Sequence, residues 1–353
     1  MASEKFRMEL PYVTQDLPGV DGKIRERNDH FIVEEVPLYE PSGEGEHLYV
    51  NITREGMTTR EIQEKLAEVF DVEVEGVGCA GMKDKYARAT QTFSVGIGKM
   101  ESESLEDVEE KITENLPVTV NWLQMHTNKL RAGHLLGNRF TIKITNLKDE
   151  LIVALERARV IADRIKEKGL PNFYGPQRFG LNGENVSKGF EIIQGNYSVD
   201  DKWLRRLLIS SYQSYLCNRY LAKRLESKLF DKILRGDVAK KYDTGGLFEV
   251  EDPAAEQSRY EEKEISFTAP IYGSNMMEAT GPSGEMEAEV LKEFGITIEK
   301  LSSAGANGTR RLGRVMVSDL ELRGVEDGLV VKFFLPKGAF ATTVLREIMK
   351  KDL

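Results

Sequence analysis

The order of strand-like and helical segments constrains the fold of this chain more than any other feature of the sequence. Alternating or β-branched runs, typical of half-buried strands, occupy residues 31–36, 48–52, 140–144, 314–318 and 329–335. Helical patterns occupy residues 59–70, 149–168, 200–235 and 342–350. Strands come first, helices follow and strands return, which predicts an α+β fold whose sheet is interrupted by a large, partly helical insertion. We expect a discontinuous sheet domain over 1–168 and 315–353, and an inserted domain over 169–314.

The length and composition exclude several classes of protein. At 353 residues the chain exceeds what one compact domain usually holds. Hydrophobic residues make up 40% and charged residues 30%, which is typical of a folded, soluble protein. No apolar run is long enough to span a membrane, and the first ten residues lack the apolar core of a signal peptide. We therefore expect no membrane partner. Two cysteines, Cys79 and Cys217, cannot make a disulfide framework, which indicates a reduced, cytoplasmic protein. Four histidines and no C-x-x-C pair predict that there is no structural metal.

Charge is unevenly distributed along the chain. The net charge of −9 argues against a nucleic-acid partner, yet residues 202–241 hold eleven basic and only three acidic residues. A helix over residues 203–228 would carry two basic stripes, with Arg205, Arg219 and Lys223 on one and Arg206 and Arg224 about 100° round the axis. This spacing predicts a face that binds nucleic-acid phosphates, and an ordinary solvated helix is the alternative.

A glycine motif, G-x-G-x-x-G, runs from Gly76 to Gly81. A dinucleotide site needs a helix after such a motif, but a strand-like run at 92–95 follows too soon. A phosphate loop is also excluded, because Lys83 is one residue late and no Ser or Thr follows it. The glycines can instead form a tight loop that presents Lys83, Asp84 and Lys85. A carboxylate flanked by two cations can act as a nucleophile or a base, although a solvated turn has the same composition.

Three further segments combine glycine with aromatic and basic side chains. Residues 171–180 hold three aromatic residues, an arginine, two glycines and two prolines, which predicts a rigid loop with exposed ring faces. Residues 130–140 place a basic turn before a strand, and residues 335–346 form a loop that begins a helix. Such loops can hold bases or phosphates, or can fill a domain junction. A phenylalanine in them is more often part of the core than a ligand contact.

Together these segments resemble the tRNA pseudouridine synthases of the D type (TruD). The resemblance runs nearly end to end and rests on residues 29–35, 43–48, 80–91, 130–140, 171–180, 310–311 and 335–347. The patterns Gly-x-Lys-Asp-x-x-Ala-x-x-x-Gln and Asn-x-x-Gly-x-Gln-Arg-Phe-Gly are specific in combination. Residues 230–270 match the family poorly. The resemblance implies a pseudouridine-synthase-type antiparallel sheet in the catalytic domain and an inserted TruD domain over 169–314.

The resemblance also implies a reaction, in which the C1′–N1 bond of a uridine breaks and the base rejoins the sugar through C5. Asp84 stands at the position of the family's catalytic carboxylate. Two mechanisms are open for this carboxylate, which can act at C1′ or can remove the 2′ proton. The base must leave its stack to reach this carboxylate. The family's substrate-binding positions correspond to Phe31, Asn138, Phe140 and Phe340, and Arg25 and Lys83 are expected to support the carboxylate.

The implied partner is tRNA, with uridine-13 as the usual target, and no cofactor, metal or obligatory protein partner is expected. A non-catalytic RNA-binding or RNA-folding protein of the same fold is the alternative function. An oxidoreductase with a nucleotide cofactor is a third hypothesis and rests on the glycine motif alone. The intact pair of Lys83 and Asp84 favours the isomerase over the non-catalytic protein.

Overall fold

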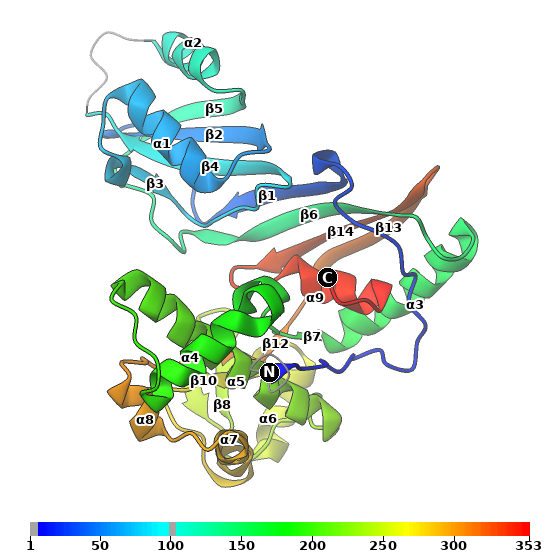
Figure 1. Cartoon of the computed structure of the whole chain (residues 1–353). Helices are drawn as coiled ribbons and strands as arrows, with labels where there is room; N and C mark the ends of the chain where they lie inside the picture. The colour runs from blue at the N-terminus through cyan, green and yellow to red at the C-terminus, as the bar shows by residue number, and fades with distance from the viewer. Residues whose placement is uncertain (1–5, 99–103) are drawn as a thin grey trace. The chain divides into compact units, whose positions relative to one another are not determined.

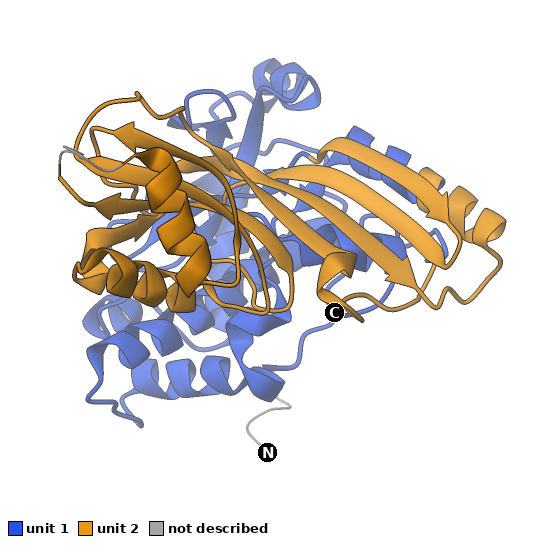
Figure 2. Ribbon diagram, turned by 90° about the horizontal axis from the view of Figure 1, so that it is seen from above, with its two compact units in different colours: residues 1–19, 160–316, 339–353 blue, residues 20–159, 317–338 orange. Residues whose placement is uncertain are grey.

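The computed structural model of the chain describes residues 6–98 and 104–353. Residues 1–5, the first half of the N-terminal stretch considered above for a signal peptide, lie outside the described residues. Packing divides the chain into two compact units, which Figure 2 shows in different colours. Unit 1 consists of residues up to Gly19 together with 160–316 and 339–353, and unit 2 consists of residues 20–159 and 317–338.

Both ends of the chain pack with the middle segment in unit 1. The carboxylate of Glu347, on α9 (Ala341–Met349), accepts hydrogen bonds from the backbone N–H groups of Val13 and Thr14 at 2.8 and 3.2 Å. The sequence analysis grouped these ends with the sheet domain, because local patterns do not reveal which core a terminal helix joins. The compact units therefore differ from the predicted domain bounds at both termini.

Unit 2 is built on one eight-stranded sheet, which is displayed in Figure 1. Its strands are β1 (Phe31–Pro37), β2 (His47–Glu55), β3 (Val77–Cys79), β4 (Arg88–Gly96), β5 (Thr119–His126), β6 (Leu135–Thr145), β13 (Ser318–Val325) and β14 (Gly328–Pro336). They lie in the order β13-β14-β6-β1-β4-β2-β5, and β3 pairs with β4. The last two strands come from the C-terminal part of the chain, so the predicted return of the chain to its first sheet is confirmed.

The sheet departs from the antiparallel expectation at one pair of strands. β1 and β4 run parallel, with Val33 opposite Ala89, while the other neighbours in the sheet are antiparallel. Parallel neighbours need a long connection between them. The chain between β1 and β4 supplies it with β2, the helix α1 (Thr59–Phe70) and β3.

Two helices cover one face of this sheet. α1 begins with a capping box between Thr58 and Glu61, and α2 (Leu105–Asn115) begins with one between Ser104 and Asp107. Ile62 from α1 and Ile112 from α2 belong to one buried cluster with apolar residues of β2, β3, β4 and β5. The predicted helix at 59–70 is confirmed, and its apolar residues face the sheet as the periodicity requires.

Unit 1 combines helices with small sheets. Its helices are the end of α3 (Leu151–Lys168), α4 (Glu184–Gln194), α5 (Lys202–Glu226), α6 (Pro253–Glu261), α7 (Gly281–Glu293), α8 (Ile298–Ser303) and α9. Its strands are β7 (Leu170–Pro171), β8 (Val238–Lys241), β9 (Leu247–Glu249), β10 (Ile265–Ile271), β11 (Thr309–Leu312) and β12 (Arg314–Val315). The strands form a sheet of order β11-β10-β8-β9 and a separate β7–β12 pair. Residues 230–270, which match the family poorly in sequence, thus hold β8, β9, α6 and most of β10.

The helix α5 forms the centre of unit 1. Asp201 caps it by accepting hydrogen bonds from the backbone of Trp203 and Leu204. The helical pattern predicted over 200–235 is confirmed for 202–226 and is wrong for 227–235, which form turns and irregular backbone. Its middle residues, 211–218, are all buried, so little of the helix surface meets solvent. Arg224, predicted on a basic stripe, is fully buried and forms an ion pair with Asp237 at 2.7 Å. That prediction is wrong, because helical spacing does not show that residues 229–237 and Phe267 of β10 enclose this side chain.

Candidate functional site

The loop 80–87 joins β3 to β4 and carries Asp84 at its exposed edge. Ala80 and Ala87 are buried at the two ends of the loop, whereas the side chain of Asp84 is 46% exposed. Gly78 stands before the loop because a Cβ atom there would lie 2.2 Å from the carbonyl oxygen of Leu130. The glycine motif therefore permits close strand packing, and no helix follows it to hold a pyrophosphate.

A buried arginine from β2 holds the backbone of this loop. The Arg54 guanidinium donates to the carbonyl oxygens of Lys83 and Asp84 at 3.3 and 3.4 Å, and also to the carbonyl of Met57 and the hydroxyl of Thr59. Burial lowers the pKa of Arg54, and the carboxylates of Glu61 and Asp84 oppose that shift. One side chain thus fixes the peptide groups on both sides of the Asp84 Cα.

The buried side chains of Thr59 and Gln91 also hold the loop through hydrogen bonds. The hydroxyl of Thr59 accepts a hydrogen bond from the backbone N–H of Lys83 at 2.9 Å and donates to Gln91 Oε1 at 3.1 Å. The amide of Gln91 in turn donates to the carbonyl of Gly81. Sequence reasoning did not assign a role to Arg54 or Thr59, and only the glutamine of the family pattern pointed to this network.

Arg25 provides the cation at the Asp84 carboxylate. Arg25 Nη2 donates to Asp84 Oδ2 at 2.7 Å, and the guanidinium lies 4.3 Å from the centre of the Phe31 ring. The backbone of Arg25 is left-handed, with φ of +60°, a costly conformation for a residue with a Cβ atom. The predicted proximity of Arg25 to this carboxylate matches the geometry.

The two lysines beside Asp84 in the sequence do not flank its carboxylate. Lys83 Nζ lies 2.6 Å from Glu35 Oε2, and this ion pair is almost fully buried. Lys85 Nζ lies 3.1 Å from Glu61 Oε1 at the surface. The expectation of a carboxylate between two cations is therefore wrong, because each lysine pairs with a glutamate of another element, Glu35 of β1 and Glu61 of α1. Lys83 holds the loop through its buried ion pair with Glu35 of β1.

The aromatic residues predicted for the pocket include two that lie near Arg25. Phe31 and Phe140 come from the paired strands β1 and β6, and their rings form an edge-to-face contact at 6.2 Å. Phe140 also stacks on Phe333 of β14 at 5.3 Å. Both Phe31 and Phe140 are buried, at 3% and 8% exposed, so each is part of the unit 2 core as well as a candidate contact.

Asn138 lies two residues before Phe140 on β6, which places both side chains on the same face of the sheet. It is directly opposite Glu35 of β1. Its Oδ1 atom is buried and has no hydrogen-bond partner among the described residues. A buried acceptor without a partner is costly unless a ligand satisfies it, so this atom is a candidate substrate contact.

Phe340 belongs to unit 1, whereas the other predicted substrate-binding residues belong to unit 2. It caps α9, is 37% exposed, and its ring lies 5.8 Å from that of Tyr174. The guanidinium of Arg311 lies 4.0 Å from the Tyr174 ring and 5.7 Å from the Phe340 ring. The structure therefore groups Phe340 with aromatic and basic residues of the 171–180 and 310–311 segments.

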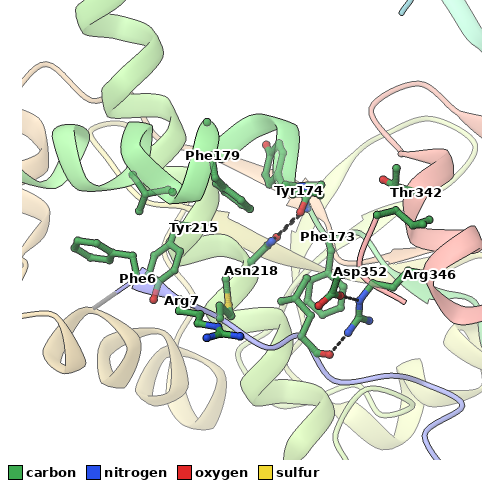
Figure 3. Close-up of a pocket in the computed structure, with 18 of the residues that line it drawn as sticks. Phe6, Arg7, Phe173, Tyr174, Phe179, Tyr215, Asn218, Thr342, Arg346 and Asp352 are labelled. Atoms are coloured by element: carbon green, nitrogen blue, oxygen red, sulfur yellow. Dashed lines mark hydrogen bonds and ion pairs between the residues drawn. The ribbon is translucent and has the colours of Figure 1, made fainter. Parts of the chain in front are cut away.

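Unit 1 also contains a cavity of about 570 Å³ that the sequence analysis did not foresee. Figure 3 shows the rings of Phe173, Tyr174, Phe179 and Tyr215 around it. The side chain of Asn218 bonds both the N–H and the carbonyl of Tyr174, at 2.8 and 2.9 Å, which fixes that wall. The aromatic loop at 171–180 was the only sequence signal for this cavity.

Two of the three basic residues predicted to bind nucleic acid are paired within unit 1. Arg219 lies 2.8 Å from Glu293, and Lys223 forms an ion pair with Glu289, both on α7. Arg205 has no ion pair among the residues that the structure describes. These two glutamates of α7 thus neutralise part of the basic helix.

No group of three or more His, Cys, Asp or Glu side chains that could hold a metal ion occurs in 6–98 and 104–353. Over the same residues, no helix is long and apolar enough to cross a membrane. Cys79 and Cys217 are both free.

Comparison with known proteins identifies the family. A family model described as tRNA pseudouridine synthase D (TruD) matches residues 7–200 and 198–348. A tRNA pseudouridine synthase D from Thermus thermophilus is 44% identical over 349 residues, covering 98% of this chain and 94% of the relative. One from Anaeromyxobacter dehalogenans is 41% identical over 352 residues, covering 98% and 97% of the two chains.

A solved structure supports the fold. The crystal structure of a protein from Methanosarcina mazei, described as a tRNA pseudouridine synthase D, matches with a TM-score of 0.80 at 24% identity. The match covers 99% of this chain and 98% of that chain, so the α+β prediction is confirmed over the whole fold. The chain therefore belongs to the tRNA pseudouridine synthase D (TruD) family.

Proposed function

We propose that this protein converts a uridine of tRNA to pseudouridine, with Asp84 as the catalytic carboxylate. The observation that carries the proposal is the solvent-accessible Asp84 carboxylate, held on an anchored loop beside Arg25 in a chain of this family. An anchored carboxylate reaches its target without a large entropic cost, which is a general requirement of efficient catalysis. The reaction is an isomerisation, so it needs no redox partner.

Each nearby residue has a role in this proposal. Asp84 acts on the ribose, either at C1′ or on the 2′ proton. Arg25 orients the carboxylate through its hydrogen bond, and Lys83 supports the loop through the buried pair with Glu35. The Asn138 Oδ1 atom accepts a hydrogen bond from the uracil edge or the ribose, which would satisfy its buried lone pairs.

Three aromatic residues are the remaining proposed contacts for a base. Phe31, whose ring lies under the Arg25 guanidinium, and its neighbour Phe140 are proposed to provide the apolar surface that a flipped-out pyrimidine needs. Phe340 is proposed as a further base contact, because its ring remains partly accessible in unit 1. Its neighbours Tyr174 and Arg311 provide the same kind of ring and guanidinium surface.

The finer points of the proposal follow from the family. We place the target at uridine-13, the reaction in the cytoplasm, and the catalytic domain in residues 1–168 and 315–353 around an inserted TruD domain. Among the three α5 cations, Arg205 carries most of the proposed RNA contact, because Arg219 and Lys223 already have acidic partners.

The test is pseudouridine mapping on tRNA treated with the parent protein and with Asp84→Asn. The substitution keeps the shape of the side chain and removes its charge, so we expect no isomerisation and tRNA binding within a few-fold of the parent. Asp327→Asn is a matched control, because Asp327 is an exposed carboxylate paired with Lys143. Pseudouridine formed by Asp84→Asn would contradict the assignment of Asp84. A parent protein that binds tRNA and modifies nothing would support the non-catalytic RNA-binding alternative.

A further inference from the structure

Two large apolar side chains stand at the surface on either side of Asp84. Met82 and Tyr86 are each 69% exposed, among the most exposed large apolar side chains of the described residues. The Tyr86 hydroxyl has no hydrogen-bond partner within the described part of the chain. Neither side chain packs into the described apolar clusters of unit 2, so the fold itself gains little from their identity.

The loop that carries them is nevertheless firmly held. Between the two side chains, Lys83 turns inward to Glu35, while Arg54 binds the carbonyls of Lys83 and Asp84. The side chains of Met82 and Asp84 are thus exposed, whereas that of Lys83 is buried in its ion pair. Exposed apolar groups on an anchored loop form a preorganised contact surface, because little conformational entropy is lost when a ligand covers them.

Isolated exposed apolar residues are common and need no explanation. Here, however, both lie within two residues of the same carboxylate, which limits each Cα to about 7 Å from that of Asp84. Any RNA whose uridine reaches Asp84 must bring its neighbouring nucleotides to within reach of these side chains. Tyrosine rings stack on bases of any sequence, and the methionine thioether packs well against aromatic rings.

We propose that Met82 and Tyr86 contact the nucleotides that flank the target uridine, and so form an RNA-binding surface around the carboxylate. This inference rests on the proposed function, since it takes Asp84 as the group that the uridine approaches. The contact is through ring and thioether surface, and the tyrosine hydroxyl is not needed for it. Binding by this surface is therefore tolerant of the identity of the flanking bases.

The experiment measures the dissociation constant of bulk tRNA in the Asp84→Asn background, where turnover does not disturb the equilibrium. We expect Met82→Ala and Tyr86→Ala each to weaken binding by about fivefold or more, the range of one base–aromatic contact. Tyr86→Phe should stay within about twofold of its parent, because the ring remains. Ile152→Ala, which truncates an apolar side chain that is 67% exposed on α3, is the matched control and should bind like the parent.

Three results would overturn the inference. The first is binding by Met82→Ala and Tyr86→Ala that is equal to the Ile152→Ala control. The second is a loss with Tyr86→Phe as large as that with Tyr86→Ala, since that would assign the contact to the hydroxyl. The third is a parent protein with no affinity for tRNA. Because all three side chains are exposed, melting temperatures should be unchanged, so a loss of binding cannot be attributed to unfolding.

The same measurements separate this inference from the proposed function. If the protein without the Asp84 substitution binds tRNA but forms no pseudouridine, the proposed function fails while the binding comparison still stands. If pseudouridine forms and the two alanine variants bind normally, the proposed function stands and the flanking-nucleotide surface is wrong.

Discussion

Arg25 Nη2 lies 2.7 Å from Asp84 Oδ2, although the two residues are 59 positions apart in the chain. The same guanidinium covers the ring of Phe31, and the Arg25 backbone adopts a left-handed conformation to reach both groups. Backbone strain of this kind persists only where the surrounding structure holds it, and such sites are often functional. The pair therefore links the segment before β1 to the loop before β4.

Replacing Arg25 tests this link. Arg25→Gln removes the charge beside the carboxylate, and we expect the rate of pseudouridine formation to fall by about tenfold or more, as for the loss of one charge-assisted hydrogen bond. The melting temperature should change little, because the ion pair is partly exposed and such pairs contribute little stability. Arg27→Gln is the control, since Arg27 forms a similar surface pair with Asp29. Equal rates for the two variants would contradict the role of Arg25.

Arg54 should matter for both stability and activity. Arg54→Met leaves the buried carbonyls of Lys83 and Asp84 without a donor, so we expect the free energy of unfolding to fall by more than about 2 kcal/mol. Arg54→Lys keeps the charge but cannot reach four acceptors at once, and should give an intermediate loss. Urea denaturation and kcat/KM measured on the same preparations check this. Activity that survives Arg54→Met unchanged would show that the loop holds its shape without the arginine.

Phe31 and Phe340 should respond differently to truncation. Phe31 is buried, so Phe31→Ala should cost about 3–5 kcal/mol of stability together with activity. Phe340 is partly exposed at the start of α9, so Phe340→Ala should lower activity with a much smaller loss of stability. Thermal melts and single-turnover rates measured side by side make the comparison. A loss of stability with Phe340→Ala as large as that with Phe31→Ala would indicate a purely structural role.

The α5 cations should contribute unequally to tRNA binding. Arg205→Gln should flatten the dependence of log K on log salt by about one unit, the value for one phosphate contact. Arg219→Gln and Lys223→Gln should change the slope less, because Glu293 and Glu289 already compensate their charges. Filter binding over a salt series measures the three slopes. Equal slopes for Arg205→Gln and the parent protein would remove α5 from the RNA-binding surface.

Unit 2 should lose stability as the pH falls below neutral. Burial lowers the pKa of His126, and His47 nearby shifts it in the same direction. The neutral ring is required because its Nδ1 atom accepts a hydrogen bond from the backbone N–H of Ser42 at 3.1 Å. With a folded pKa below the unfolded value of about 6.5, this contribution is full above pH 6.5 and is lost as the pH falls through the folded pKa.

Thermal melts between pH 7.5 and about 5, a range chosen to bracket the histidine titration, should show this decline. His126→Gln cannot take up the proton, so its melting temperature should depend less on pH over the same range. A parent and a variant with the same pH dependence would contradict the assignment to His126.

The sequence by itself determined the local elements and the identity of the candidate carboxylate. The capping residues and periodicity of α1, the alternation of β1, β2, β6 and β14, and the long helix α5 all reflect short-range preferences of the backbone. The spacing of glycine, lysine, aspartate and glutamine in 80–91 likewise identified the loop that carries Asp84. Such features depend on residues close together in the chain, so they can be inferred from the sequence alone.

Only the tertiary structure decided which charges meet. Lys83 and Lys85 are the cations next to Asp84 in sequence, yet they pair with Glu35 and Glu61, and Arg25 takes their place. Arg224 is basic and helical, yet it is buried against Asp237. An ion pair depends on positions and burial set by contacts between distant segments, which period and composition do not encode.

The parallel pairing of β1 with β4 and the packing of α9 with unit 1 belong to the same class of feature. For the strand β1 and for the helix α9, the local sequence pattern is compatible with several packing partners. The partner that is selected is the one whose arrangement buries the most apolar surface and satisfies the most polar groups. Both quantities depend on the complete folded chain and not on a local segment.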